Sequence, residues 1–127
     1  MKVILTEDQL NERAAYWQKV LGLQDWDVQV KKARAEAFDG DREGECEYLS
    51  NSKTARIRIL DESHYPTDAW DEQDMELTLV HELLHLHFSA IRDLAYELDH
   101  YVMFEEQAIN KMSQALVHLE RTNKAER

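Results

Sequence analysis

The segment from Leu77 to Phe88 constrains the fold more than any other part of the chain. It is apolar on nearly every face, and the exceptions are its histidines and Glu82. A helix that is apolar all round has to be buried among other elements. We therefore expect a helix from about Asp68 to Ile91 to run through the centre of the protein, with the acidic residues at its start favoured by the helix dipole.

The segments before this helix predict another helix and a small sheet. Thr6-Glu7-Asp8-Gln9 has the pattern of a capping box, which opens a helix that Gly22 would end. Polar and apolar residues alternate at 26–31, 46–49 and 54–60, as in half-buried strands, and Asn51-Ser52 reads as the turn of a hairpin between the last two.

A last helix is expected at 104–121, with a shorter one before it at 93–100. The order helix, strands, helices predicts an α+β fold with a three-stranded antiparallel or mixed sheet. At 127 residues the chain is expected to form one domain, 1–127.

Charge and cysteine content narrow the function classes. The net charge is −11, and Lys and Arg form no cluster of the kind that phosphate groups need, so direct contact with nucleic acid or with a membrane is not expected. Cys46 is the single cysteine, which excludes an internal disulfide and favours a buried or half-buried thiol in a reducing compartment. With an apolar start too short for a signal peptide, we expect a cytoplasmic protein.

The central helix carries His81-Glu82-Leu83-Leu84-His85. Histidines four residues apart lie on one face of a helix, so both rings can bind one Zn²⁺ ion. Glu82 is then placed to act as general base towards zinc-activated water. A chain rich in His and Glu produces this pattern by chance at an appreciable rate, but burying two histidines and a glutamate in an apolar helix is costly without a purpose.

A catalytic zinc ion also needs a third protein ligand. A histidine ten residues after His81 is excluded, because that position is Ile91, and the candidates are Glu105 and Glu106. A helical wheel places Glu105 in the apolar stripe of the last helix and Glu106 outside it, which favours Glu105 as the ligand. Glu106 remains the alternative, since a Glu-x-x-x-Asp/Asn pattern fits Glu106 and Asn110.

The remaining histidines and some tyrosines are secondary candidates. His87 is expected to pack beside the ligands, and His64 and His118 to lie in a loop and at the surface. An oxyanion-stabilising group is commonly a Tyr or His beside the metal, and the candidates are Tyr96, His100 and Tyr101.

Together, Val80-His81-Glu82-Leu83-Leu84-His85 and Glu105-Glu106-Gln107-Ala108-Ile109-Asn110 resemble the two motifs of a minimal gluzincin-type zinc metallopeptidase. The chain looks similar to ImmA/IrrE-like and phage-encoded small metallopeptidases. This resemblance, over about residues 26–120, implies a zincin-like domain with an active-site helix and a glutamate helix. It also implies that the strand Thr54–Leu60 is the edge strand above the cleft, where a peptide substrate pairs by β-addition.

The leading hypothesis is therefore a zinc-dependent endopeptidase that acts on a peptide or protein substrate. A regulatory protein partner is a further expectation. The alternative is a non-catalytic module in which zinc only stabilises a small binding or regulatory domain. A DNA-associated regulator with a metallopeptidase-like core is disfavoured by the acidic composition.

Overall fold

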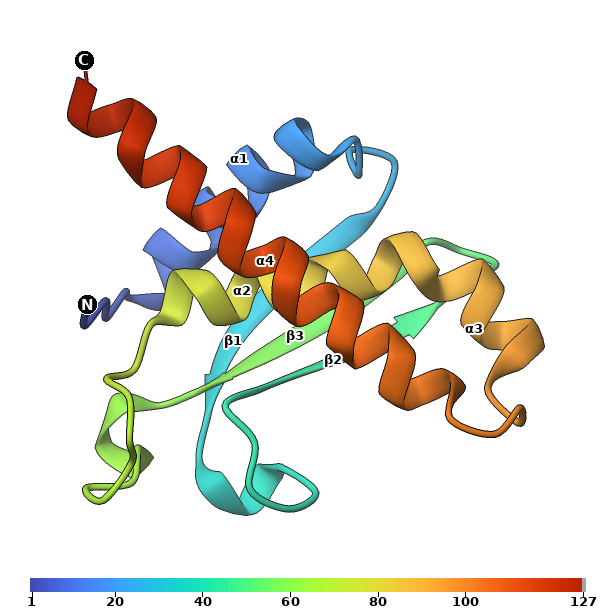
Figure 1. Ribbon diagram of the computed structural model, residues 1–127, viewed down its shortest axis with the longest axis horizontal. Coiled ribbons are helices and arrows are strands. Elements are labelled where there is room, and N and C mark those ends of the chain that lie inside the picture. Colours follow the sequence, from blue (N-terminus) through green and yellow to red (C-terminus); the bar gives the residue numbers. More distant parts are fainter. Residues whose placement is uncertain (127) are drawn as a thin grey trace.

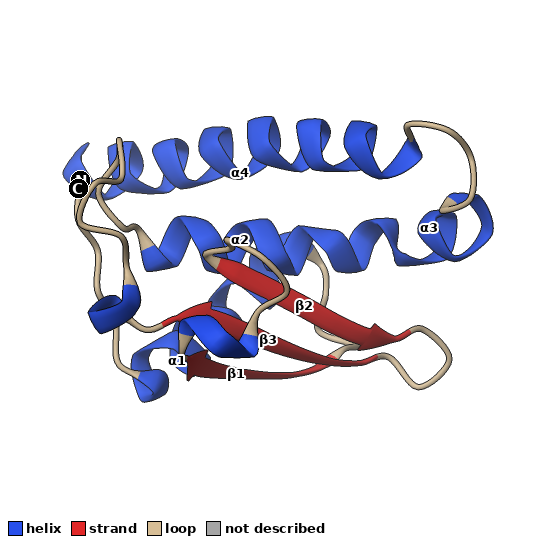
Figure 2. Ribbon diagram, turned by 90° about the horizontal axis from the view of Figure 1, so that it is seen from below, coloured by secondary structure: helices blue, strands red, loops and turns tan. Residues whose placement is uncertain are grey.

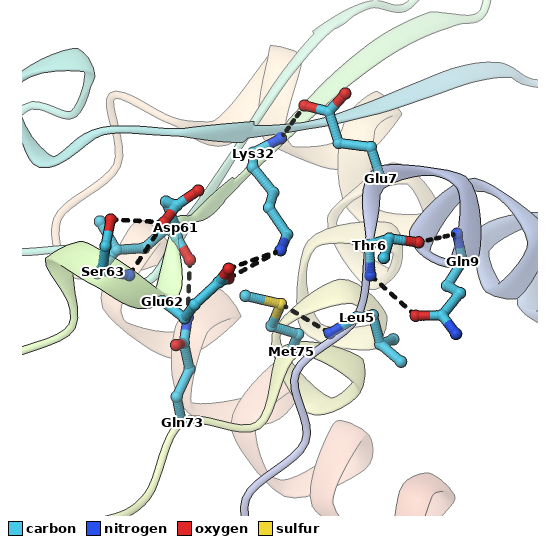
Figure 3. Close-up of polar contacts among 11 residues, drawn as sticks. Leu5, Thr6, Glu7, Gln9, Lys32, Asp61, Glu62, Ser63, Gln73 and Met75 are labelled. Atoms are coloured by element: carbon cyan, nitrogen blue, oxygen red, sulfur yellow. Dashed lines mark hydrogen bonds and ion pairs between the residues drawn. The ribbon is translucent and has the colours of Figure 1, made fainter.

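The first helix, α1 (Glu7–Leu21), has both of its predicted end signals in the computed structural model, which describes residues 1–126. The Thr6 hydroxyl accepts a hydrogen bond from the Gln9 backbone N–H at 3.1 Å, and the Gln9 side chain accepts one from the Thr6 N–H at 2.9 Å (Figure 3). Gly22 ends the helix in the left-handed region, with φ of 70°. The predicted capping box and glycine stop are confirmed.

The sheet contains β1 (Asp27–Ala33), β2 (Gly44–Leu49) and β3 (Thr54–Leu60) in the order β1-β3-β2. β3 runs antiparallel to β2 and parallel to β1, so the predicted hairpin is confirmed and the sheet is mixed. The expectation that Thr54–Leu60 is the edge strand is wrong. β3 takes the centre because it pairs with β1 along one side and with β2 along the other, and β2 is the edge strand that contacts α2.

The central helix is shorter than predicted. α2 spans Met75–Leu84, because Asp74 is its N-cap: the Asp74 carboxylate accepts from the Leu77 N–H at 3.1 Å. The chain before it is held extended by Val3, whose carbonyl accepts from the Met75 N–H at 2.9 Å. Seven residues of α2 are buried, as its apolar character predicted: Met75, Thr78, Leu79, Val80, Glu82, Leu83 and Leu84.

Beyond Leu84 the chain changes helix type. A 3-10 turn covers His85–Phe88, and α3 (Ser89–Ala95) follows it, so one predicted helix is three segments. The last helix, α4 (Tyr101–Glu126), extends past both predicted ends, while the short helix expected at 93–100 is displaced to α3.

The elements form layers with α2 in the middle. Figure 2 shows α2 between the sheet and α4, and Figure 1 shows α4 crossing over α2. Arg13 of α1 joins the three long helices, because it pairs with Glu76 of α2 at 2.6 Å and with Glu120 of α4 at 3.1 Å. These ion pairs join α1 to the first turn of α2 and to the C-terminal half of α4, away from His81 and His85.

Short connections complete the domain. A 3-10 turn at Glu62–His64 follows β3, and Lys32 of β1 reaches Glu62 there with an Nζ–Oε2 distance of 2.8 Å (Figure 3). Another 3-10 turn, Ala35–Ala37, follows β1. Within residues 1–126, no helix has both the length and the apolar character needed to cross a membrane.

Candidate metal centre

The candidate site is a group of three side chains where α4 crosses α2. His81 and His85 lie one helical turn apart, with ring centroids separated by 5.2 Å. The Glu106 carboxylate of α4 meets both rings: its Oε2 is 3.1 Å from His81 Nε2, and its Oε1 is 2.9 Å from His85 Nε2. The ligating atoms of all three side chains lie within 4.8 Å of one another.

The structure assigns different places to the two neighbouring glutamates. Glu105 is buried in the core, as the helical wheel predicted, but it is not a member of the three-residue group. Its Oε2 instead faces Nδ1, the other nitrogen of His85, at 2.6 Å. The geometry therefore places the alternative candidate Glu106, and not the preferred candidate Glu105, beside the Nε2 atoms of His81 and His85.

Glu82 lies beside this group without belonging to it. Its Oε2 is 4.0 Å from His81 Nε2, and only 8% of its side chain is exposed. Burial raises the pKa of Glu82 above its ordinary value, although the nearby histidines oppose the shift. A carboxylate with a raised pKa holds a transferred proton more readily, which is the property that a general base needs after it has taken one.

A cleft of about 580 Å³ opens onto these residues. One wall is the edge strand β2, which contributes Gly44, Cys46 and Tyr48, and the opposite wall is the polar side of α4. The cleft is also lined by Arg42 before β2 and by Arg92 of α3. The cluster is thus accessible from solvent, whereas a purely structural metal site has all its coordination positions closed by protein.

Gly44 contributes to the cleft, but the sequence did not reveal this role, because residues 39–44 read as a loop. A Cβ atom at this position would lie 2.5 Å from Thr78 Cγ2 and 3.1 Å from Glu82 Oε2. β2 therefore approaches α2 closely next to the Glu82 carboxylate, and only glycine leaves room. A glycine at the start of an alternating segment is the signal that indicates such an approach.

The carboxylates around His81 and His85 favour a positive charge at the cluster. Both nitrogens of His85 face carboxylate oxygens, at 2.6 Å for Glu105 and 2.9 Å for Glu106. Burial opposes the charged form of His85, but the Glu106 hydrogen bond and the Glu82 charge outweigh it and raise the pKa of His85. Hydrogen bonds from His81 and His85 also hold the pKa of Glu106 well below its ordinary value. A proton or a metal ion can supply the positive charge between these groups.

The donor set could hold a divalent metal ion, and zinc is one of several ions that bind such a set. Two imidazole nitrogens and one carboxylate oxygen are common ligands of catalytic zinc, and a tetrahedral ion holds its ligand atoms about 3.3 Å apart. The Glu106 oxygens Oε2 and Oε1 are 3.1 and 2.9 Å from the Nε2 atoms of His81 and His85, respectively. His81, His85 and Glu106 would hold the ion, and the cleft leaves a further position accessible.

The secondary candidates lie elsewhere. Tyr96 is 58% exposed, and none of the three expected oxyanion-stabilising residues lines the cleft. His87 is exposed rather than packed, and its Nε2 lies 2.6 Å from the Leu21 carbonyl at the end of α1. Cys46 is half-buried, as expected, and burial raises the pKa of its thiol.

Comparisons of the chain with protein-family models, with curated proteins and with solved structures find no match.

Proposed function

We propose that this protein is a zincin-like, zinc-dependent hydrolase that cleaves peptide bonds. The observation that carries the proposal is the group formed by His81, His85 and Glu106, with the buried Glu82 carboxylate beside it and a cleft in front of it. Two nitrogens, one carboxylate and a separate base are the set of groups that hydrolysis at a zinc centre needs.

In this proposal His81, His85 and Glu106 would hold the ion, which would supply Lewis acidity when bound. Glu82 takes the proton of the attacking water and delivers it to the leaving amine. Its burial serves both steps, because a raised pKa favours the protonated form that the carboxylate takes between them. Gly44 lets the strand approach Glu82 so closely that the carboxylate has little freedom to turn away.

The cleft suits an extended peptide. β2 is the edge of the sheet and pairs with β3 on one side, which leaves backbone groups on its other side for an added strand. Gly44, Cys46 and Tyr48 of β2 line the cleft next to the metal-binding residues. A substrate paired with β2 would therefore pass in front of Glu82 and the His81–His85 pair.

The test combines metal analysis with a conservative change of the base. We expect one zinc ion per chain in the wild type, in Glu82→Gln and in the control Glu12→Gln, which removes an exposed carboxylate from α1. Hydrolysis of casein or of a mixed fluorogenic peptide library should fall by about 100-fold or more in Glu82→Gln alone. Full activity in Glu82→Gln, or a wild type that binds no zinc, would refute the proposal. Zinc binding with no hydrolysis in any variant would instead favour the non-catalytic zinc module.

A further inference from the structure

Glu105 is the most buried charged side chain near the cluster, and it lies behind His85. Its side chain is 0% exposed, and a single oxygen, Oε2, is 2.6 Å from His85 Nδ1 and 2.9 Å from Arg92 Nη1. Glu106, the next residue in α4, approaches the opposite nitrogen of the same ring, Nε2, at 2.9 Å. Two consecutive glutamates therefore hold one imidazole from both sides.

The stability of the fold does not explain this arrangement. The second oxygen of Glu105, Oε1, and the Tyr101 hydroxyl one turn earlier in α4 are both buried and make no hydrogen bond of good geometry among the described residues, although the hydroxyl lies close enough to the Glu105 carboxylate to raise the tyrosine pKa. A buried ion pair such as Glu105–Arg92 is often no more stabilising than apolar residues of the same volume. Selection for stability alone favours an apolar residue at position 105.

The orientation of His85 does explain it. We infer that Glu105 is a positioning residue of the metal centre: it accepts the Nδ1–H hydrogen of His85 and so leaves the Nε2 lone pair directed at the ion, while Arg92 holds the carboxylate in place. The inference rests on the proposed zinc site. It assigns to Glu105 the supporting role that carboxylates commonly play behind metal-binding histidines. The two glutamates then have separate tasks, Glu106 on the ion and Glu105 behind the ring.

Zinc affinity measured by competition with a chromogenic chelator tests this inference without reference to catalysis. Glu105→Gln keeps the size of the side chain and an acceptor for Nδ1–H but removes the charge, and we expect about 10-fold weaker zinc binding. Glu105→Ala removes both, and we expect up to about 100-fold. In the cobalt-substituted protein, both changes should alter the visible absorption bands, which report on ligand geometry around the ion.

Glu120→Gln is the matched control. It too removes a glutamate of α4 that pairs with an arginine, with an Arg13–Glu120 distance of 3.1 Å against 2.9 Å for Arg92–Glu105. Because Glu120 lies at the other end of the helix crossing, its loss should lower the melting temperature and leave the zinc affinity and the cobalt spectrum unchanged.

The outcomes separate this inference from the proposed function. If the wild type binds no zinc, the proposed function fails. If the wild type binds zinc and Glu105→Gln binds it equally well with the same cobalt spectrum, the positioning role of Glu105 is refuted and the zinc site stands. Should Glu105→Gln fail to fold, Glu105→Asp decides, because it keeps the charge but withdraws it by one methylene group. Weaker zinc binding in Glu105→Asp supports the role, and unchanged binding overturns it.

Discussion

The substitution Gly44→Ala tests whether the close approach of β2 to α2 sets the position of the Glu82 carboxylate. The added Cβ would lie 2.5 Å from Thr78 Cγ2, 3.1 Å from Glu82 Oε2 and 3.2 Å from Glu82 Cγ. Thr78 cannot easily turn aside, because it is buried in α2 and its hydroxyl donates to the Asp74 carbonyl at 3.2 Å. Relief therefore has to come from Glu82 or from the strand.

Two opposing effects determine the expected change in the free energy of unfolding of Gly44→Ala. Overpacking of this kind costs about 1–3 kcal/mol. The backbone of Gly44 is not in the left-handed region, so alanine regains about 0.4–1 kcal/mol by restricting the unfolded chain. We expect a net loss of about 1–2 kcal/mol in the free energy of unfolding. Because a shift of a catalytic group by about 1 Å can cost 100-fold, kcat/KM should fall by a similar factor while zinc remains bound.

Gly40→Ala is the control, since it makes the same chemical change elsewhere in the chain. Gly40 has φ of 87°, and a Cβ there meets nothing within 4 Å. Alanine in this conformation costs about 1–2 kcal/mol, so the two variants should lose similar stability in urea unfolding. Only Gly44→Ala should lose peptidase activity. Wild-type kcat/KM in Gly44→Ala, with its stability lowered or not, would show that the approach of β2 does not position Glu82.

Three further outcomes are expected. Asp74→Ala should lower the free energy of unfolding by about 2 kcal/mol in urea titrations, because it removes both the N-cap of α2 and the acceptor of Arg121 at 2.7 and 2.9 Å. Burial opposes the ionisation of Glu120, but hydrogen bonds from Tyr16 and Arg13 keep its pKa below the ordinary 4.5. The stabilising contribution of the Glu120 carboxylate is therefore complete above pH 4.5 and is lost as the pH falls through the folded-state pKa. Glu120→Gln should lose less stability than the wild type between about pH 5 and 3, and equal slopes in the two proteins would contradict this. Burial raises the pKa of Cys46, so its alkylation by iodoacetamide at pH 8 should be at least 10-fold slower in the native protein than in urea, and equal rates would show an accessible thiolate.

Local sequence signals predicted the parts of the fold that local chemistry determines. The capping box at Thr6 and the glycine at position 22 define α1 because both ends use hydrogen bonds within a few residues. Alternation predicted the β2–β3 hairpin for the same reason. The start of α2 was misplaced, since acidic residues favour any helix start, whereas the actual cap at Asp74 depends on a bridge to Val3 far away in the sequence.

The position of β3 in the sheet depends on contacts that periodicity does not record. Alternating residues show which face of a strand is buried, but they do not show how many neighbours the strand has. β3 has β1 on one side and β2 on the other. It pairs in parallel with β1, although β2 lies between these two strands in the sequence. The edge strand beside the candidate metal centre is consequently β2, which the sequence analysis did not place there.

Glu105 and Glu106 differ in their burial and in the histidine atoms that they face. The helical wheel correctly identified Glu105 as the core-facing residue, and a carboxylate in a core suggested a ligand. A catalytic metal ion, however, needs a position open to water and substrate, so its ligands belong at the rim of the core. Glu106 is 43% exposed in its side chain and reaches both histidines, whereas Glu105 is fully enclosed and reaches only the back of one ring. In the proposed site the half-exposed Glu106 is therefore the candidate ligand, and the fully buried Glu105 is the group proposed to support it.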